Sequence, residues 1–148
     1  YVQDPLRILS GFYGVLKPFD GVVPYRLEMQ AKVSIDGYAN LYEYWGDSLY
    51  HEIVDDDRVI VNLASKEYSK AIEKYLEPSD SFITCIFGEI EGDKIVQKGV
   101  YAKMARGEMV RYLASIQATD PQQIKGFAWS NYAFDEAKST ETKYVFVR

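Results

Sequence analysis

Apolar and polar residues along this chain recur with two different periods, and each period predicts one type of element. Short apolar runs, and alternation at every second position, predict strands. The predicted strands are residues 6–10, 25–29, 58–63, 82–89, 95–101, 127–134 and 144–147. Apolar spacings of three and four residues predict helices. The predicted helices are residues 40–53, 66–77, 103–117 and 121–126, with N-caps at Asn40, Ser65 and Asp120.

These elements predict a mixed α/β (α+β) fold. The residues Glu91-Gly92-Asp93 form a hairpin turn signal between two of the predicted strands. Strands and helices alternate only in part, which favours a mixed sheet with a hairpin, covered by helices. A chain of 148 residues has room for one ordinary core, so residues 1–148 are predicted to form a single domain.

Composition narrows the class of protein. Apolar residues make up 47% of the chain and charged residues 26%, which is the balance of a globular domain. No apolar run of about 18 residues predicts a membrane span, and no secretory apolar segment is recognised. The single cysteine, Cys85, lies in an apolar stretch where a buried, unreactive thiol is expected. These features predict a cytoplasmic protein.

Charge is distributed unevenly along the chain. The net charge is −5, which argues against a protein whose whole surface binds polyanions. Residues 93–112 nevertheless hold five basic and two acidic residues, a local charge of +3. A basic patch of this kind attracts phosphate groups locally.

The basic residues of the third predicted helix are the most informative candidates. At about 100° per residue, Lys103, Arg106 and Arg111 all fall outside the apolar stripe. Gly107 lies among them, although glycine costs about 1 kcal/mol relative to alanine inside a helix. A basic helix face with a glycine suits a phosphate backbone, because guanidinium groups bind phosphate oxygens in pairs. The alternative is a solvated face on which Glu108 balances part of the charge.

Further candidates lie in the first half of the chain. Gly11 and Gly14 suit either an anion-binding loop or a tight packing turn. Arg26 and Glu28 share one face of a predicted strand, as either a surface ion pair or an anion-binding arginine held by its neighbour. The residues predicted to form a supporting polar pocket are Glu28, Asp47, Asn62 and Ser65.

Other chemistries have little support. No Gly-x-Ser-x-Gly elbow surrounds Ser65, and His51 has no evident partner for a Ser-His-Asp triad. One cysteine and one histidine cannot make a conventional zinc site. No catalytic residue, cofactor or metal site is therefore predicted, although a site of carboxylates alone, for magnesium or iron, stays open.

Several blocks of sequence resemble the YaaA family of bacterial peroxide-stress proteins and occur in the same order. They are Leu-Ser-Gly-Phe-Tyr-Gly-Val-Leu at 9–16, Pro-Tyr-Arg-Leu-Glu-Met at 24–29, Leu-Tyr-Glu-Tyr-Trp-Gly-Asp at 41–47, Val-Asn-Leu-Ala-Ser-Lys-Glu-Tyr at 61–68 and Lys-Met-Ala-Arg-Gly-Glu-Met-Val-Arg-Tyr at 103–112. The likeness extends over essentially all 148 residues. Members of the family are longer, so this chain looks like the C-terminal part of such a protein.

The resemblance implies a cytosolic protein that limits damage during hydrogen peroxide stress, is linked to low free iron, and binds DNA through a basic cleft. It implies no catalytic activity. Carried onto this chain, the residues expected to contact the DNA backbone are Lys17, Arg26, Lys103, Arg106 and Arg111. Two alternatives stay open: an enzyme acting on a phosphorylated or nucleic-acid substrate, with Glu28 or Asp47 as general base, and iron sequestration by the carboxylates at residues 55–57.

Overall fold

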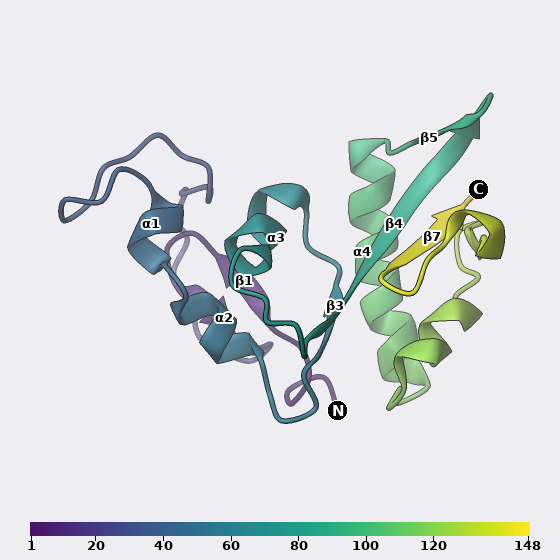
Figure 1. Ribbon diagram of the computed structural model, residues 1–148, viewed down its shortest axis with the longest axis horizontal. Coiled ribbons are helices and arrows are strands. Elements are labelled where there is room, and N and C mark those ends of the chain that lie inside the picture. Colours follow the sequence, from purple (N-terminus) through teal and green to yellow (C-terminus); the bar gives the residue numbers. More distant parts are fainter. The chain divides into compact units, whose positions relative to one another are not determined.

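The computed structural model describes residues 1–148 and confirms the mixed α/β fold (Figure 1). The chain divides into two units. Unit 1 holds Tyr1–Ile60 and Ala64–Asp80, and unit 2 holds Val61–Leu63 and Ser81–Arg148. The boundary between the two units therefore runs through strand β3 (Val59–Asn62).

Unit 2 is built on β4 (Ser81–Glu91), a strand of 11 residues. Strand β7 (Lys143–Val147) pairs with β4 in parallel, and β6 (Ala133–Phe134) pairs antiparallel with β7. The order of the sheet is β3-β4-β7-β6, while β5 (Lys94–Val96) folds back on the end of β4 as the predicted hairpin. The sheet is therefore mixed, as predicted.

Helix α4 (Gly99–Ser115) lies along this sheet (Figure 1). It begins earlier than predicted, because residues 99–101 are helical rather than the end of a strand. Buried residues of α4 and the sheet share one cluster: Ile83, Cys85, Phe87, Ala105, Met109, Ile124, Phe127, Tyr132, Tyr144 and Phe146. Burial raises the pKa of Cys85 to about 12, so the thiol is protonated and unreactive, as expected.

Two 3₁₀ helices complete unit 2. Helix η1 (Pro121–Gly126) begins where a short helix is predicted, and Asp120 caps it by accepting a hydrogen bond from the backbone N–H of Gln122 at 2.7 Å. Helix η2 (Glu136–Lys138) precedes β7. The strand predicted at residues 127–134 is largely wrong, because only its last two residues, β6, pair with another strand.

Unit 1 holds a small hairpin and three short helices. Strands β1 (Ile8–Ser10) and β2 (Gly14–Leu16) form a small antiparallel hairpin. Helices α2 (Ser48–Ile53) and α3 (Lys66–Glu73) pack against each other. The buried apolar residues of the unit are Met29, Leu41, Leu49, Tyr50, Ala71 and Ile72.

The helix predicted at residues 40–53 is two helices, α1 (Leu41–Trp45) and α2. Asn40 caps α1 as predicted, by accepting a hydrogen bond from the backbone N–H of Glu43 at 3.0 Å. Gly46 then adopts a φ of 54° and a ψ of −134°, a conformation that residues with a side chain rarely adopt. This glycine ends α1 and redirects the chain.

The strand predicted at residues 25–29 is wrong, because none of these residues belongs to a strand. Met29 is fully buried, whereas Tyr25 and Arg26 are exposed. The alternation therefore reflects a half-buried segment that has no partner strand. Arg26 and Glu28 do not share a strand face, and no ion pair joins them.

None of the helices has the length and apolar character that crossing a membrane requires.

Candidate functional site

Helix α4 carries three of the predicted contact residues, Lys103, Arg106 and Arg111, along one stretch of unit 2. The spacing of its buried residues fixes which side of the helix faces the core: Ala102, Ala105 and Met109. At about 100° per residue, the three basic residues span an arc of about 140°, with Lys103 between the two arginines. They therefore present one continuous basic strip.

Arg106 lies at the edge of the buried stripe and is half-buried. Its Nε–H is shielded from solvent and has no hydrogen-bond acceptor. Burial lowers the pKa of Arg106, and no carboxylate counteracts that effect. A desolvated guanidinium without a counter-ion has unused capacity to bind an anion.

Glu108 does not neutralise Arg106. Two residues along a helix turn a side chain by about 200°, so the carboxylate faces the opposite flank of α4. There its Oε1 accepts a hydrogen bond from the hydroxyl of Ser130 at 2.7 Å. Ser130 and Asn131 have φ values of 51° and 65°, so this contact holds a turn of left-handed residues against α4.

Lys103 and Arg111 are exposed, and neither forms an ion pair. The guanidinium carbon of Arg111 lies 5.9 Å from the ring centre of Trp129, which is a cation–π contact. This contact orients the arginine without cancelling its charge.

Several other basic residues of the chain are paired. A carboxylate oxygen lies within 4.0 Å of each of the following cations: Arg58, Lys66, Lys98, Lys138 and Arg148. The chain has 22 acidic residues against 17 basic ones, so counter-ions are plentiful. The three adjacent cations of the strip on α4 are not in this set and form no ion pair.

The two remaining predicted contact residues, Lys17 and Arg26, belong to unit 1. Both side chains are exposed and neither forms an ion pair. The predicted contact residues are thus divided, two in unit 1 and three in unit 2.

Two of the four residues of the predicted polar pocket, Asp47 and Asn62, have separate local partners. Asp47 Oδ2 lies 3.4 Å from His51 Nε2, one turn further along α2. Asn62 is buried in β3, an edge strand, and its Nδ2 donates to Thr84 Oγ1 of β4 at 3.2 Å. Ser65 occupies the N-cap position of α3, although its hydroxyl makes no capping hydrogen bond. Glu28 is exposed.

Packing explains the two glycines at the start of the chain. A Cβ on Gly11 would lie 2.8 Å from the carbonyl oxygen of Leu27. Gly14 has a φ of 79°, and a Cβ there would lie 2.9 Å from the ring of Trp45. The indole N–H of Trp45 also donates to the carbonyl oxygen of Gly11 at 3.0 Å. These contacts favour the packing turn over the anion-binding loop.

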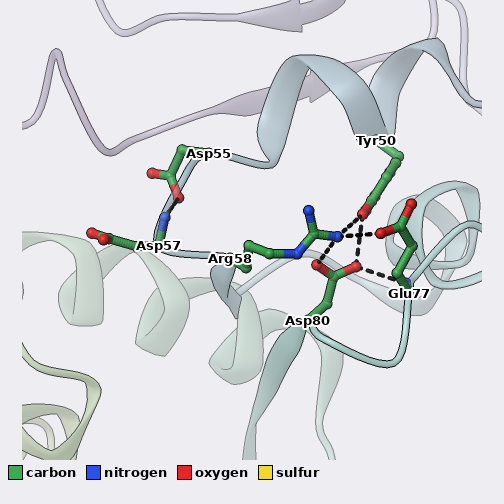
Figure 2. Close-up of polar contacts among 6 residues, drawn as sticks. All are labelled: Tyr50, Asp55, Asp57, Arg58, Glu77 and Asp80. Carbon is green, nitrogen blue, oxygen red and sulfur yellow. Dashed lines mark hydrogen bonds and ion pairs between the residues drawn. The ribbon is translucent and has the colours of Figure 1, made fainter.

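The acidic stretch at residues 55–57 forms a turn, in which the backbone N–H of Asp57 donates to Asp55 Oδ1 at 3.1 Å (Figure 2). No group of three or more histidine, cysteine, aspartate and glutamate side chains is placed to hold a metal ion. The geometry therefore gives no support to iron sequestration at this stretch.

A polar network surrounds Arg58, immediately after the acidic stretch (Figure 2). Its Nη2 donates to Glu77 Oε2 at 2.7 Å and to the hydroxyl of Tyr50 at 2.9 Å. The same nitrogen lies 2.8 Å from Asp80 Oδ1. The side chain of Asp80 is completely buried, and its Oδ2 accepts a hydrogen bond from Tyr50 at 2.8 Å. Internal partners thus satisfy the charges of this network, which joins α2 to the residues that precede β3 and β4.

Two features of the α4 strip were not predicted from sequence: the half-burial of Arg106 and the contact between Arg111 and Trp129. The half-burial of Arg106 could have been predicted from the spacing of the buried residues along the helix. Arg106 lies four residues after Ala102 and three before Met109, and both of those residues are buried. No comparable signal marks Trp129, because it comes from a segment distant in sequence.

Comparison with known proteins relates the chain to one family. A family model described as peroxide stress protein YaaA matches residues 1–138. A UPF0246 protein of Agathobacter rectalis is 61% identical over 148 residues, which are 100% of this chain and 59% of the relative. UPF0246 proteins of Desulfitobacterium hafniense and Lachnoclostridium phytofermentans are 53% and 52% identical over 148 residues, again 100% of this chain and 59% and 58% of the relatives.

The chain spans less than two thirds of the length of these relatives. The family match nevertheless covers most of the chain. The chain therefore belongs to the peroxide stress protein YaaA family.

Proposed function

We propose that this chain is a cytoplasmic DNA-binding part of a peroxide-stress protein, and that α4 supplies its main contact with the DNA backbone. The observation that carries the proposal is the state of Arg106, a half-buried guanidinium without a counter-ion. A phosphate group would supply the missing negative charge.

The length of the basic strip favours an extended polyanion over a small one. At about 1.5 Å per residue, Lys103 and Arg111 stand about 12 Å apart along the helix axis. One phosphate group cannot reach both ends of the strip, whereas successive phosphates of a nucleic acid can. Lys17 and Arg26 of unit 1 are proposed as further backbone contacts, because both are exposed and unpaired.

The test is fluorescence anisotropy of labelled duplex and single-stranded DNA, titrated with the chain at several salt concentrations. The five proposed phosphate contacts predict that log affinity falls with log salt with a slope of about −3.5 to −4.5. Arg106→Gln and Arg111→Gln are each expected to weaken binding about tenfold and to reduce the slope by about one.

Lys138→Gln is the matched control. It removes the same charge from unit 2, but Lys138 lies outside the strip and already has Asp135 at 4.0 Å. Equal losses in all three variants would indicate a general charge effect and contradict a site on α4. Absence of binding by the unaltered chain at low salt would contradict the proposal as a whole.

Backbone binding also gives a physical route to protection from iron. Cations that bind phosphates displace the counter-ions held there, and ferrous iron on DNA is such a counter-ion. We therefore expect the chain to reduce DNA strand breaks produced by ferrous iron and hydrogen peroxide, and Arg106→Gln to reduce them less. Equal numbers of breaks with and without the chain would contradict this role.

A further inference from the structure

Gly107 is a helical glycine that nothing in the chain explains. A Cβ built on Gly107 would meet no atom within 4 Å. Other glycines have evident reasons: a Cβ on Gly126 would lie 2.5 Å from the hydroxyl of Tyr112, and one on Gly88 would lie 2.4 Å from Ile95. Glycine destabilises a helix interior, so an open position would favour alanine unless something outside the chain comes close.

Gly107 lies in a row with two unpaired cations. Lys103, Gly107 and Arg111 follow one another at spacings of four residues, so they lie along the axis of α4 on one exposed side. Beside this row, Val100 and Met104 are 71% and 57% exposed, which provides apolar surface as well as charge. The row therefore offers a cation at each end and bare backbone in the middle.

We propose that a nucleic-acid strand runs along this row, with its sugar–phosphate backbone against Gly107 and its phosphates on Lys103 and Arg111. This inference rests on the proposed function. It adds that the strand runs parallel to the axis of α4 and that its backbone comes closest to the helix at Gly107. A side chain at position 107 would stand between the two cations and hold the strand away from both.

Charge argues against a second copy of the chain as the occupant of the row. Two copies of α4 packed through Gly107 in antiparallel fashion would place Lys103 of each against Arg111 of the other. Such a contact brings like charges together without a counter-ion, whereas a phosphate backbone neutralises both.

The test compares Gly107→Ala and Gly107→Leu with the unaltered chain, by anisotropy with labelled DNA and by thermal unfolding. Both substitutions favour the helix, so the melting temperature is expected to rise by a few degrees. Binding is expected to weaken in order of side-chain size, about threefold for alanine and at least about tenfold for leucine. Stability and affinity therefore move in opposite directions, which a folding defect cannot produce.

Gly21→Ala and Gly21→Leu are the matched controls. Gly21 is exposed and lies in unit 1, outside α4. A Cβ added to Gly21 would likewise meet no atom within 4 Å. These variants are expected to bind DNA like the unaltered chain.

The outcomes separate this inference from the proposed function. If the unaltered chain binds DNA and Gly107→Leu binds equally well, the inference is wrong and the proposed function stands. If the unaltered chain does not bind DNA, the proposed function itself fails. Self-association of the chain that Gly107→Leu abolishes, seen by sedimentation velocity, would show a second copy on the row and also overturn the inference.

Discussion

Arg58 in unit 1 and Arg106 in unit 2 are both half-buried, and both have an Nε–H that is buried without an acceptor. They differ in the ion pairs that the guanidinium group forms. Arg58 contacts two carboxylates, Glu77 and Asp80, whereas Arg106 contacts none.

The pKa values of the two arginines shift in opposite directions for this reason. Burial acts to lower the pKa of Arg58, but the charge of Asp80 leads a set of interactions that together raise it. Burial lowers the pKa of Arg106 unopposed. The comparison teaches that burial of an arginine does not by itself indicate its role. A paired arginine holds structure together, and an unpaired one is available to a ligand.

The largest expected effect is on stability, from breaking the network of Arg58. Asp80→Asn leaves Arg58 with one exposed carboxylate partner in place of a buried pair, and removing one member of a buried pair is strongly destabilising. We expect the melting temperature to fall by at least several degrees, measured by circular dichroism.

Asp56→Asn is the control for this prediction, because Asp56 is exposed in the neighbouring turn and has no ion pair. It is expected to leave the melting temperature almost unchanged. Equal effects of the two substitutions would mean that the network around Arg58 contributes little to stability.

The same comparison predicts how acid affects each region. Burial acts to raise the pKa of Asp80, but hydrogen bonds from the backbone N–H of Glu77 and from Tyr50, with the charge of Arg58, lower it overall. A carboxyl group with a depressed pKa contributes stability above its unfolded pKa of about 4, and this contribution is lost as the pH falls below that value.

We therefore expect stability to decline as the pH is lowered below about 4, and Asp80→Asn to make that decline shallower. Glu89 in unit 2 accounts for part of what remains, because hydrogen bonds from Lys98 and Arg148 lower its pKa. Identical pH profiles for the unaltered chain and Asp80→Asn, followed by urea unfolding, would contradict this account of Asp80.

The smallest expected effect is a gain in the stability of the protein when Arg106 is replaced. Arg106→Met replaces an unpaired, partly desolvated cation with an apolar side chain of similar length. We expect the melting temperature to rise by about 2 °C, because sites kept for binding are often not optimal for stability. Lys103→Met is the control, since Lys103 is exposed and its charge is not desolvated. A loss of stability in Arg106→Met alone would indicate that Arg106 is structural, like Arg58.

Sequence predicted the parts of the fold that depend on nearby residues. The hairpin at Glu91-Gly92-Asp93, the cap at Asp120 and most of α4 are local, and all three are confirmed. The strand at residues 25–29 failed, because a strand also needs a partner and local alternation cannot reveal one. The single helix at residues 40–53 failed at Gly46, where one backbone conformation interrupts an otherwise regular apolar spacing.

The candidate site shows the same division. Spacing alone placed Lys103, Arg106 and Arg111 on one helix outside its apolar stripe. Whether each cation is paired depends on residues from other segments, as with Arg58 and Asp80, so it could not be predicted. The absence of a packing reason for Gly107 likewise appears only once the surroundings of α4 are known.

The contrast between the two arginines can be tested in one experiment, by following arginine side-chain Nε–H signals by NMR while an oligonucleotide is added. We predict that the signal of Arg106 shifts and that its hydrogen exchange slows, because phosphate fixes the guanidinium. The signal of Arg58 is predicted to stay unchanged, because its partners are internal. A shift at Arg58, or no change at Arg106 under conditions where the DNA binds, would contradict the assignment of Arg106 as the ligand-binding arginine.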